Sequence, residues 1–310
     1  MSLKRFLGAT AGAVGLAAAG NYWLRCRAGP LGPPLGGTDR SLDWRGFEIA
    51  CRELGDPDDP DLVCLHGIHA AASSHEFADV AEALAAEYHV IAPDLLGFGR
   101  SDRPRIEYTP AIYSGVIETV LAATEAPTVL ASSLSAAYVA ASDAELAELV
   151  AVCPTDRTMA LSGARTILAV PVVGRTAFNV LVSRPAIRYC YADHGVADPD
   201  AIDPLRVEYD WRSAHQSGAR WAPAAFLEGA LQPDRSLETL FGDLDAPVRV
   251  FWGQAADLPG LDRGRALTEA VGGELVIFED AALLPHVECP DRFVAAVAGH
   301  GRNDAAKPQD

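Results

Sequence analysis

Lysine is almost absent from this sequence. Its 310 residues include only two lysines, Lys4 and Lys307, and 25 lysines and arginines in total stand against 42 aspartates and glutamates. The net charge of -17 argues against a nucleic-acid partner, because phosphate binding needs clustered lysines and arginines. A lysine-poor acidic surface is typical of proteins from salt-adapted organisms, and a GC-rich coding bias would produce the same composition.

Closely spaced cysteines are also missing. The six cysteines are scattered, without a CxxC pair or metal-ligand spacing. Cys51, Cys64 and Cys153 lie inside apolar, strand-like runs, where cysteine behaves as a small hydrophobic residue. We therefore expect free thiols, a reducing compartment, no metal and no cofactor.

One long apolar run is present, over residues 7–24, and Lys4, Arg5, Arg25 and Arg27 flank it. As a helix it would reach about 27 Å, just enough for a thin bilayer, although Asn21 and four glycines weaken the insertion. We predict a transmembrane helix that tethers a membrane-anchored protein through residues 4–27, with the side of the membrane undetermined. A cleaved signal peptide of a secreted protein and a soluble helix of a cytoplasmic protein are the alternatives.

The remaining chain divides by its hydrophobic pattern. Strand-like and helix-like stretches alternate on both sides of a segment without strand alternation, which indicates βαβ units and a mainly parallel sheet of the α/β class. The hydrophobic share of 49% is enough for a large core. The predicted organisation is an anchor or signal over 1–27, a linker over 28–40, an α/β core over 41–155 and 236–300, a helical cap over 156–235, and a disordered tail over 301–310.

Residues 128–137, TVLASSLSAA, predict the nucleophile. An apolar run ends at Ser132, Ser133 follows, and a small-residue stretch of helical character begins. A serine held on such a strand-to-helix turn is a nucleophile elbow, which needs small residues two positions before and two after it. Here those positions hold Ala131 and Ser135 in place of the usual glycines.

Four motifs together resemble the α/β-hydrolase superfamily, of the type with a cap insertion. They are LHG at 65–67, DLLGFGRSDRP at 94–104, the elbow at 131–135 and WG at 252–253. The resemblance covers residues 41–299 and implies an α/β-hydrolase fold with a mainly parallel central sheet flanked by helices, and with the helical cap inserted after the sixth strand. It also implies a small-molecule substrate, while the oligomeric state stays undetermined.

Carried over residue by residue, the resemblance makes Ser133 the nucleophile. The backbone amides of Leu134 and Ile68 would form the oxyanion hole, and His66 would have a structural role. A serine at this position, where dehalogenases and epoxide hydrolases of the superfamily carry aspartate, implies acyl transfer.

The acid and base depart from the family's pattern. The late strand usually ends WGxxD, but in this sequence Asp257 comes one residue late, and Asp156 is the alternative acid. Leu283 occupies the position of the family's histidine, so the region is non-standard. His286, three residues later, is the predicted base, with His194 and His215 as alternatives.

The predicted function is therefore a serine esterase that cleaves a small carboxylic ester, lactone or related acyl substrate. Leu283 motivates the alternative of a degenerate, catalytically weak member that binds a ligand or partner. Cofactor-free lyase or C-C hydrolase chemistry also stays open, because the fold hosts many reactions.

Overall fold

A single mixed sheet of eight strands forms the centre of the molecule. The structure is a computed structural model that describes residues 3–299, with side chains described from residue 12 onward. The strand order is β1-β2-β4-β3-β5-β6-β7-β8, in which β1, β2 and β4 pair antiparallel and all other pairs are parallel. The strands are β1 Thr38–Trp44, β2 Phe47–Leu54, β3 Asp61–Leu65, β4 His89–Pro93, β5 Thr128–Ser132, β6 Glu148–Val152, β7 Val248–Gly253 and β8 Glu274–Phe278.

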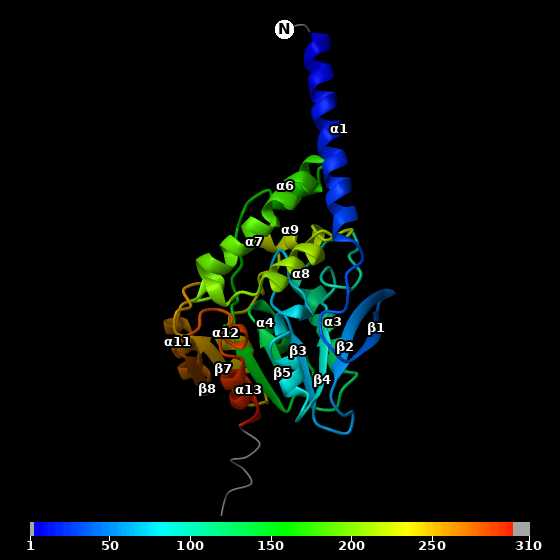
Figure 1. Cartoon of the computed structure of the whole chain (residues 1–310). Coiled ribbons are helices and arrows are strands. Elements are labelled where there is room, and N and C mark those ends of the chain that lie inside the picture. The colour runs from blue at the N-terminus through cyan, green and yellow to red at the C-terminus, as the bar shows by residue number, and fades with distance from the viewer. Residues whose placement is uncertain (1–2, 300–310) are drawn as a thin grey trace, which may run out of the picture.

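One helix precedes this sheet in the sequence, others cover its faces, and a further group is inserted between β6 and β7 (Figure 1). Those of the core are η1 Ser74–Phe77, α2 Ala81–Leu84, α3 Pro110–Leu121, α4 Leu134–Ala140, α10 Leu237–Gly242, α11 Leu261–Val271, α12 Pro285–Glu288 and α13 Pro290–Ala298. Those between β6 and β7 are α5 Ala164–Ala169, α6 Val173–Leu181, α7 Arg184–Cys190, η2 Tyr191–Gly195, η3 Pro199–Ala201, α8 Pro204–Ala214 and α9 Trp221–Glu228. The α/β-hydrolase fold predicted from the sequence is confirmed.

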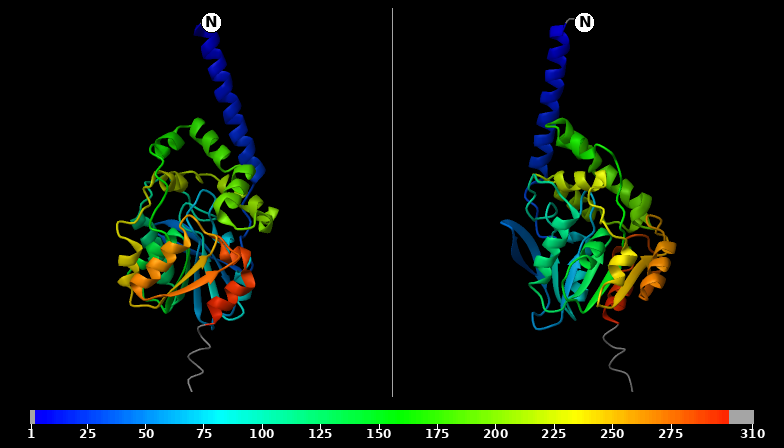
Figure 2. Two further views of the ribbon diagram at one scale, coloured as in Figure 1. Left: turned by 90° about the vertical axis from the view of Figure 1, so that its left-hand side faces the viewer. Right: turned by 180° about the vertical axis from the view of Figure 1, so that it is seen from behind.

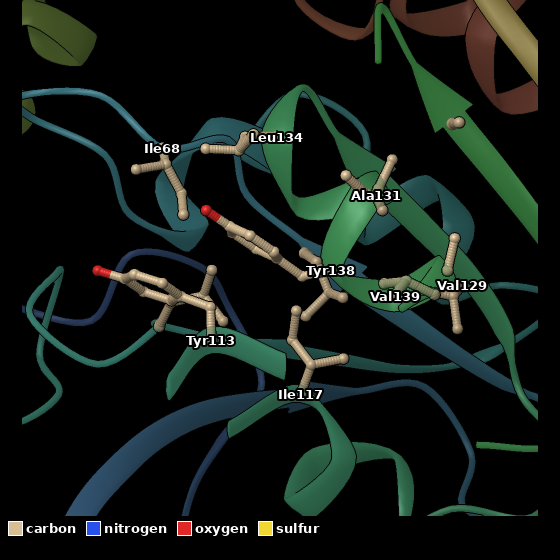
Figure 3. Close-up of a cluster of buried hydrophobic side chains, with 14 of the residues drawn as sticks. Ile68, Tyr113, Ile117, Val129, Ala131, Leu134, Tyr138 and Val139 are labelled. Carbon is tan, nitrogen blue, oxygen red and sulfur yellow. The ribbon is translucent and has the colours of Figure 1, made fainter. Parts of the chain in front are cut away.

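The two faces of the sheet carry separate hydrophobic cores. On β5, Val129 and Ala131 face the cluster built with α3 and α4, whereas Leu130 faces the cluster built with α2 and α13. This alternation follows from the period of two in a strand and explains why β5 is apolar on both sides. Figure 3 shows the first cluster, in which the rings of Tyr113 and Tyr138 stack with centroids 5.5 Å apart.

The helices α5 to α9 lie over one end of the sheet in all three ribbon views (Figures 1 and 2). Residues that follow β3 line a cavity together with residues of α6 and α7, so these helices cover the carboxyl ends of the parallel strands. That is the edge at which α/β proteins place their ligands. We call residues 156–235 the insertion.

The N-terminal helix α1 (Leu3–Ala28) does not carry the predicted membrane span. Among the described residues, no helix is long and apolar enough to cross a bilayer, so the predictions of a transmembrane helix and of a membrane-anchored protein are wrong. The physical reason lies in the composition of α1, because its glycines, Asn21 and flanking arginines dilute the apolar run.

The second half of α1 packs on the insertion instead. Asn21 is 6% exposed, and its side-chain amide donates hydrogen bonds to the Val172 carbonyl and to Thr176 Oγ1 and accepts one from Asn179 Nδ2. The segment after α1 is also bound, since Arg212 donates to the carbonyls of Ala28 and Pro30. The predicted tail over residues 301–310 lies outside the described residues.

Candidate active site

Ser133 lies at the sharp turn between β5 and α4. Its φ of 54° and ψ of -123° fall in a region that residues other than glycine rarely occupy. Its backbone N–H donates to the Val152 carbonyl at 2.9 Å, which ties the turn to the end of β6. Ser132 and Leu134 are buried on either side, whereas Ser133 is half-buried. The turn therefore holds this serine at the sheet edge in a strained conformation, as a nucleophile elbow does.

The loop after β3 passes directly over this serine. A Cβ placed on Gly67 would lie 3.4 Å from both Ser133 Cβ and Ser132 Oγ, and 3.5 Å from Glu76 Oε2. A side chain at position 67 would thus fill the space beside the elbow. In Figure 3 the side chains of Ile68 and Leu134 lie together at one end of the hydrophobic cluster, so both predicted amide donors stand on residues that the core anchors.

Three buried side chains hold this loop in place. The Gly67 N–H donates to Glu76 Oε2 at 2.8 Å, and Ser135 Oγ donates to the His66 carbonyl at 2.6 Å. His66 Nε2 accepts the Leu95 N–H at 3.0 Å, so its Nδ1 carries the proton and donates to the Gly67 carbonyl at 2.7 Å. Burial lowers the pKa of His66, which keeps the ring neutral and in this tautomer. These bonds give His66 a structural task.

The two predicted acids lie in different surroundings. Asp257 is exposed on the loop after β7. Asp156 Oδ2 accepts the Leu237 N–H at 3.1 Å and lies 3.5 Å from an Arg263 guanidinium nitrogen, so it binds the start of α10 and its neighbour α11. The described contacts bring neither carboxylate to a predicted histidine.

The alternative bases are also placed apart from the elbow. His215 is buried at the end of α8, where its Nδ1 lies 2.7 Å from the Trp211 carbonyl and its ring packs on the Trp211 ring. His194 lies in η2, 3.4 Å from Asp193, on the wall of the cavity under the insertion. Leu283, at the position where the resemblance led us to expect a histidine, lines the same cavity with an aliphatic side chain.

His286 is fully buried in α12 and approaches the Glu76 carboxylate oxygen that the loop does not bind. Its ring centroid lies 5.4 Å from that of Phe77 and 5.5 Å from that of Phe293. Its Nε2 is 3.4 Å from Glu76 Oε1. Burial, and then the charge of Arg206, lower the pKa of His286 to about 3, so the ring is neutral near pH 7.

Glu76 is the site residue that sequence reasoning missed. It is 8% exposed, and burial raises the pKa of its carboxyl, while hydrogen bonds from Ser132 and Gly67 oppose that rise. Within the described chain, Oε1 has no hydrogen-bond partner apart from the long approach of His286. The available signal was the position of Glu76 directly before the largely apolar stretch FADVAEAL at 77–84, because buried carboxylates are rare without a task.

His69, the residue after Ile68, lines a cavity of about 180 Å³. Side chains of the loop, the insertion and the segment before α12 line it, and most of them are apolar, among them Ala71, Leu181, Val182, Ile187, Leu283 and Leu284. The polar groups in its wall include His69, Tyr191, His194 and Asp210. A concave apolar space with a few polar groups is the usual form of a small-molecule site.

The sequence matches the alpha/beta hydrolase family over residues 62–296, and the chain belongs to that family. An uncharacterized protein of Mycobacterium tuberculosis is 27% identical over 273 residues, which cover 81% of this chain and 77% of the relative. A haloalkane dehalogenase of Bradyrhizobium diazoefficiens is 41% identical over 63 residues, 20% of each chain.

Solved structures show the same fold. A putative aryl esterase from Burkholderia cenocepacia superposes with a TM-score of 0.67 at 18% identity, and the match covers 87% of this chain and all of that one, 100%. The chain is thus a member of a family of hydrolases, and its reaction is argued below from its own site.

Proposed function

We propose that this chain is a serine-nucleophile hydrolase that acts on a small carboxylic ester, lactone or related acyl substrate. The observation that carries the proposal is the strained, half-buried Ser133 beside Gly67 at the elbow. Support also comes from the apolar cavity that begins beside the same loop.

In the proposed reaction, Ser133 Oγ attacks the acyl carbon and forms an ester with the acyl group. The backbone N–H groups of Leu134 and Ile68 stabilise the negative oxygen that develops on the substrate. The released alcohol takes up a proton, and water then hydrolyses the acyl-serine and restores Ser133.

We assign the proton acceptor to Glu76. A neutral imidazole with a pKa of about 3 is a weak base, so His286 fits the role less well than a carboxylate whose pKa is raised by burial. Glu76 Oε2 and Ser133 Cβ both lie within 3.5 Å of the point that a methyl group on Gly67 would occupy, which places the two atoms within about 7 Å of each other. In this arrangement His286 contacts the other carboxylate oxygen of Glu76, Oε1.

Labelling with a fluorophosphonate probe tests the nucleophile. We expect the native protein to be labelled, Ser133→Ala to lose the label, and Ser142→Ala, the same change two residues after α4, to keep it. Labelling that survives Ser133→Ala would refute the assignment. Hydrolysis of p-nitrophenyl acetate and butyrate, with the same variants, tests turnover.

Ligand binding without turnover is a second candidate, and Leu283 favours it. An aliphatic side chain in place of the family's histidine removes the usual base from the cavity wall. A native protein that binds small esters in calorimetry, but neither hydrolyses them nor takes the fluorophosphonate label, would establish this alternative over the first.

A further inference from the structure

The cavity beside the oxyanion loop has one feature that an apolar acyl pocket does not need, a buried carboxyl group. Asp210, on α8, is 5% exposed and lies in the cavity wall among the aliphatic side chains described above. A carboxylate in such surroundings is unfavourable unless hydrogen-bond donors or a positive charge compensate it.

Only part of this compensation comes from the protein. Tyr191 O–H donates to Asp210 Oδ2 at 2.6 Å. In residues 12–299, whose side chains are described, Oδ1 accepts no hydrogen bond within normal geometry. The positive charge of Arg206 acts on Asp210, but its guanidinium donates to Asp79 and to the carbonyls of His75 and Glu76.

The cavity has room for an aromatic ring. A cavity of about 150 Å³ lined by aliphatic and aromatic side chains holds a benzene ring. The volume of about 180 Å³ therefore suits a group of benzyl size, with Asp210 Oδ1 available to a single polar substituent.

We propose that this cavity binds an apolar group of about benzyl size that carries one hydrogen-bond donor, a hydroxyl or an ammonium group, and that Asp210 recognises this donor. The proposal deepens the proposed function, because it names the class of group that the substrate of Ser133 would place under the insertion. His69 and His194 also belong to the polar part of the wall.

The test measures binding without hydrolysis. Ser133→Ala protein is titrated calorimetrically at pH 8 with toluene, benzyl alcohol and benzylammonium, which share one ring and differ in the donor. At this pH Asp210 is ionised, because burial raises its pKa only to about 6. We expect benzyl alcohol or benzylammonium to bind about 10-fold or more tightly than toluene, since a hydrogen bond to a charged group has that magnitude. The tighter of the two identifies the donor.

A variant of Asp210 separates recognition from folding. In the Ser133→Ala background, Asp210→Leu, which removes every acceptor at this position, should bring the donor ligands to within about 2-fold of toluene and should still bind toluene. Asp79→Asn is the matched control, because Asp79 bonds the same Arg206 but lies outside the cavity wall. It should keep the preference.

Equal affinity for the three ligands, no binding of any of them, or an unchanged preference in Asp210→Leu would overturn the proposal. Its failure is distinguishable from that of the proposed function, because binding is measured without Ser133 and labelling is measured without these ligands.

Discussion

Glu76 Oε1 lies 3.4 Å from His286 Nε2, although 210 positions separate the two residues in the sequence, and both side chains are buried. The other carboxylate oxygen of Glu76 accepts the Gly67 N–H at 2.8 Å. Glu76 therefore links the loop over Ser133 to a neutral imidazole in the second hydrophobic core.

Glu76→Gln should lower kcat by about 100-fold or more, as expected for loss of a general base. The glutamine oxygen can still accept the Gly67 N–H, so KM and the unfolding temperature should change little. Ester hydrolysis over pH 5 to 9 checks this, and the acidic limb of the native kcat profile should disappear. Glu82→Gln, the same change at an exposed position of α2, is the control. A kcat equal to that of the native protein would remove Glu76 from the mechanism.

His286 should make the stability of the protein depend on pH. The pKa of His286 is about 3 in the folded protein, whereas an ordinary histidine, as in the unfolded chain, has a pKa of 6.5. The unfolded chain therefore takes up this proton first as the pH falls. The contribution is complete above pH 6.5 and is lost as the pH falls towards 3, with about 2 kcal/mol lost between pH 6.5 and pH 5.

Urea denaturation at several pH values measures this effect. The free energy of unfolding of His286→Phe, relative to the native protein, should rise by about 2 kcal/mol between pH 7 and pH 5. Parallel pH curves for native protein and His286→Phe would contradict the lowered pKa.

Leu283→His should restore a base at the cavity wall. General bases contribute roughly 100- to 10,000-fold in enzymes, and an unoptimised one should raise p-nitrophenyl butyrate hydrolysis by about 10-fold. Leu284→His, in which the neighbouring cavity residue is changed, is the matched control. The same gain from both variants would point to general basicity of the cavity rather than to position 283.

Ser133 should cost the protein stability. Backbone strain of this kind is worth about 1–3 kcal/mol, and glycine adopts positive φ without it. The free energy of unfolding of Ser133→Gly should therefore exceed that of Ser133→Ala by about 1 kcal/mol. At Glu118, exposed in the helix α3, the order should be reversed, because alanine favours helix over glycine by a similar amount. A more stable Ser133→Ala would show that the turn is not strained.

Much of the fold was predictable because its signals are local. Apolar runs of strand length mark β3, β5 and β7, and small residues around Ser133 mark the turn. The N-terminal run misled because its length matches a membrane span, whereas its glycines and Asn21 leave α1 insufficiently apolar to cross a bilayer. Asn21, which weakens insertion into a bilayer, is the residue that bonds α1 to α6.

By itself, the sequence indicated the α/β alternation of the core and the serine at a strand-to-helix turn, and it has a leucine at position 283. Only the tertiary structure decided which ionisable groups surround that serine. It joined Glu76 to Gly67 and His286, and it placed Asp210 beside Tyr191 in the cavity wall. The physical reason is that periodicity reports which face of an element is buried, whereas pKa and hydrogen bonding depend on the side chains that distant elements bring to that face.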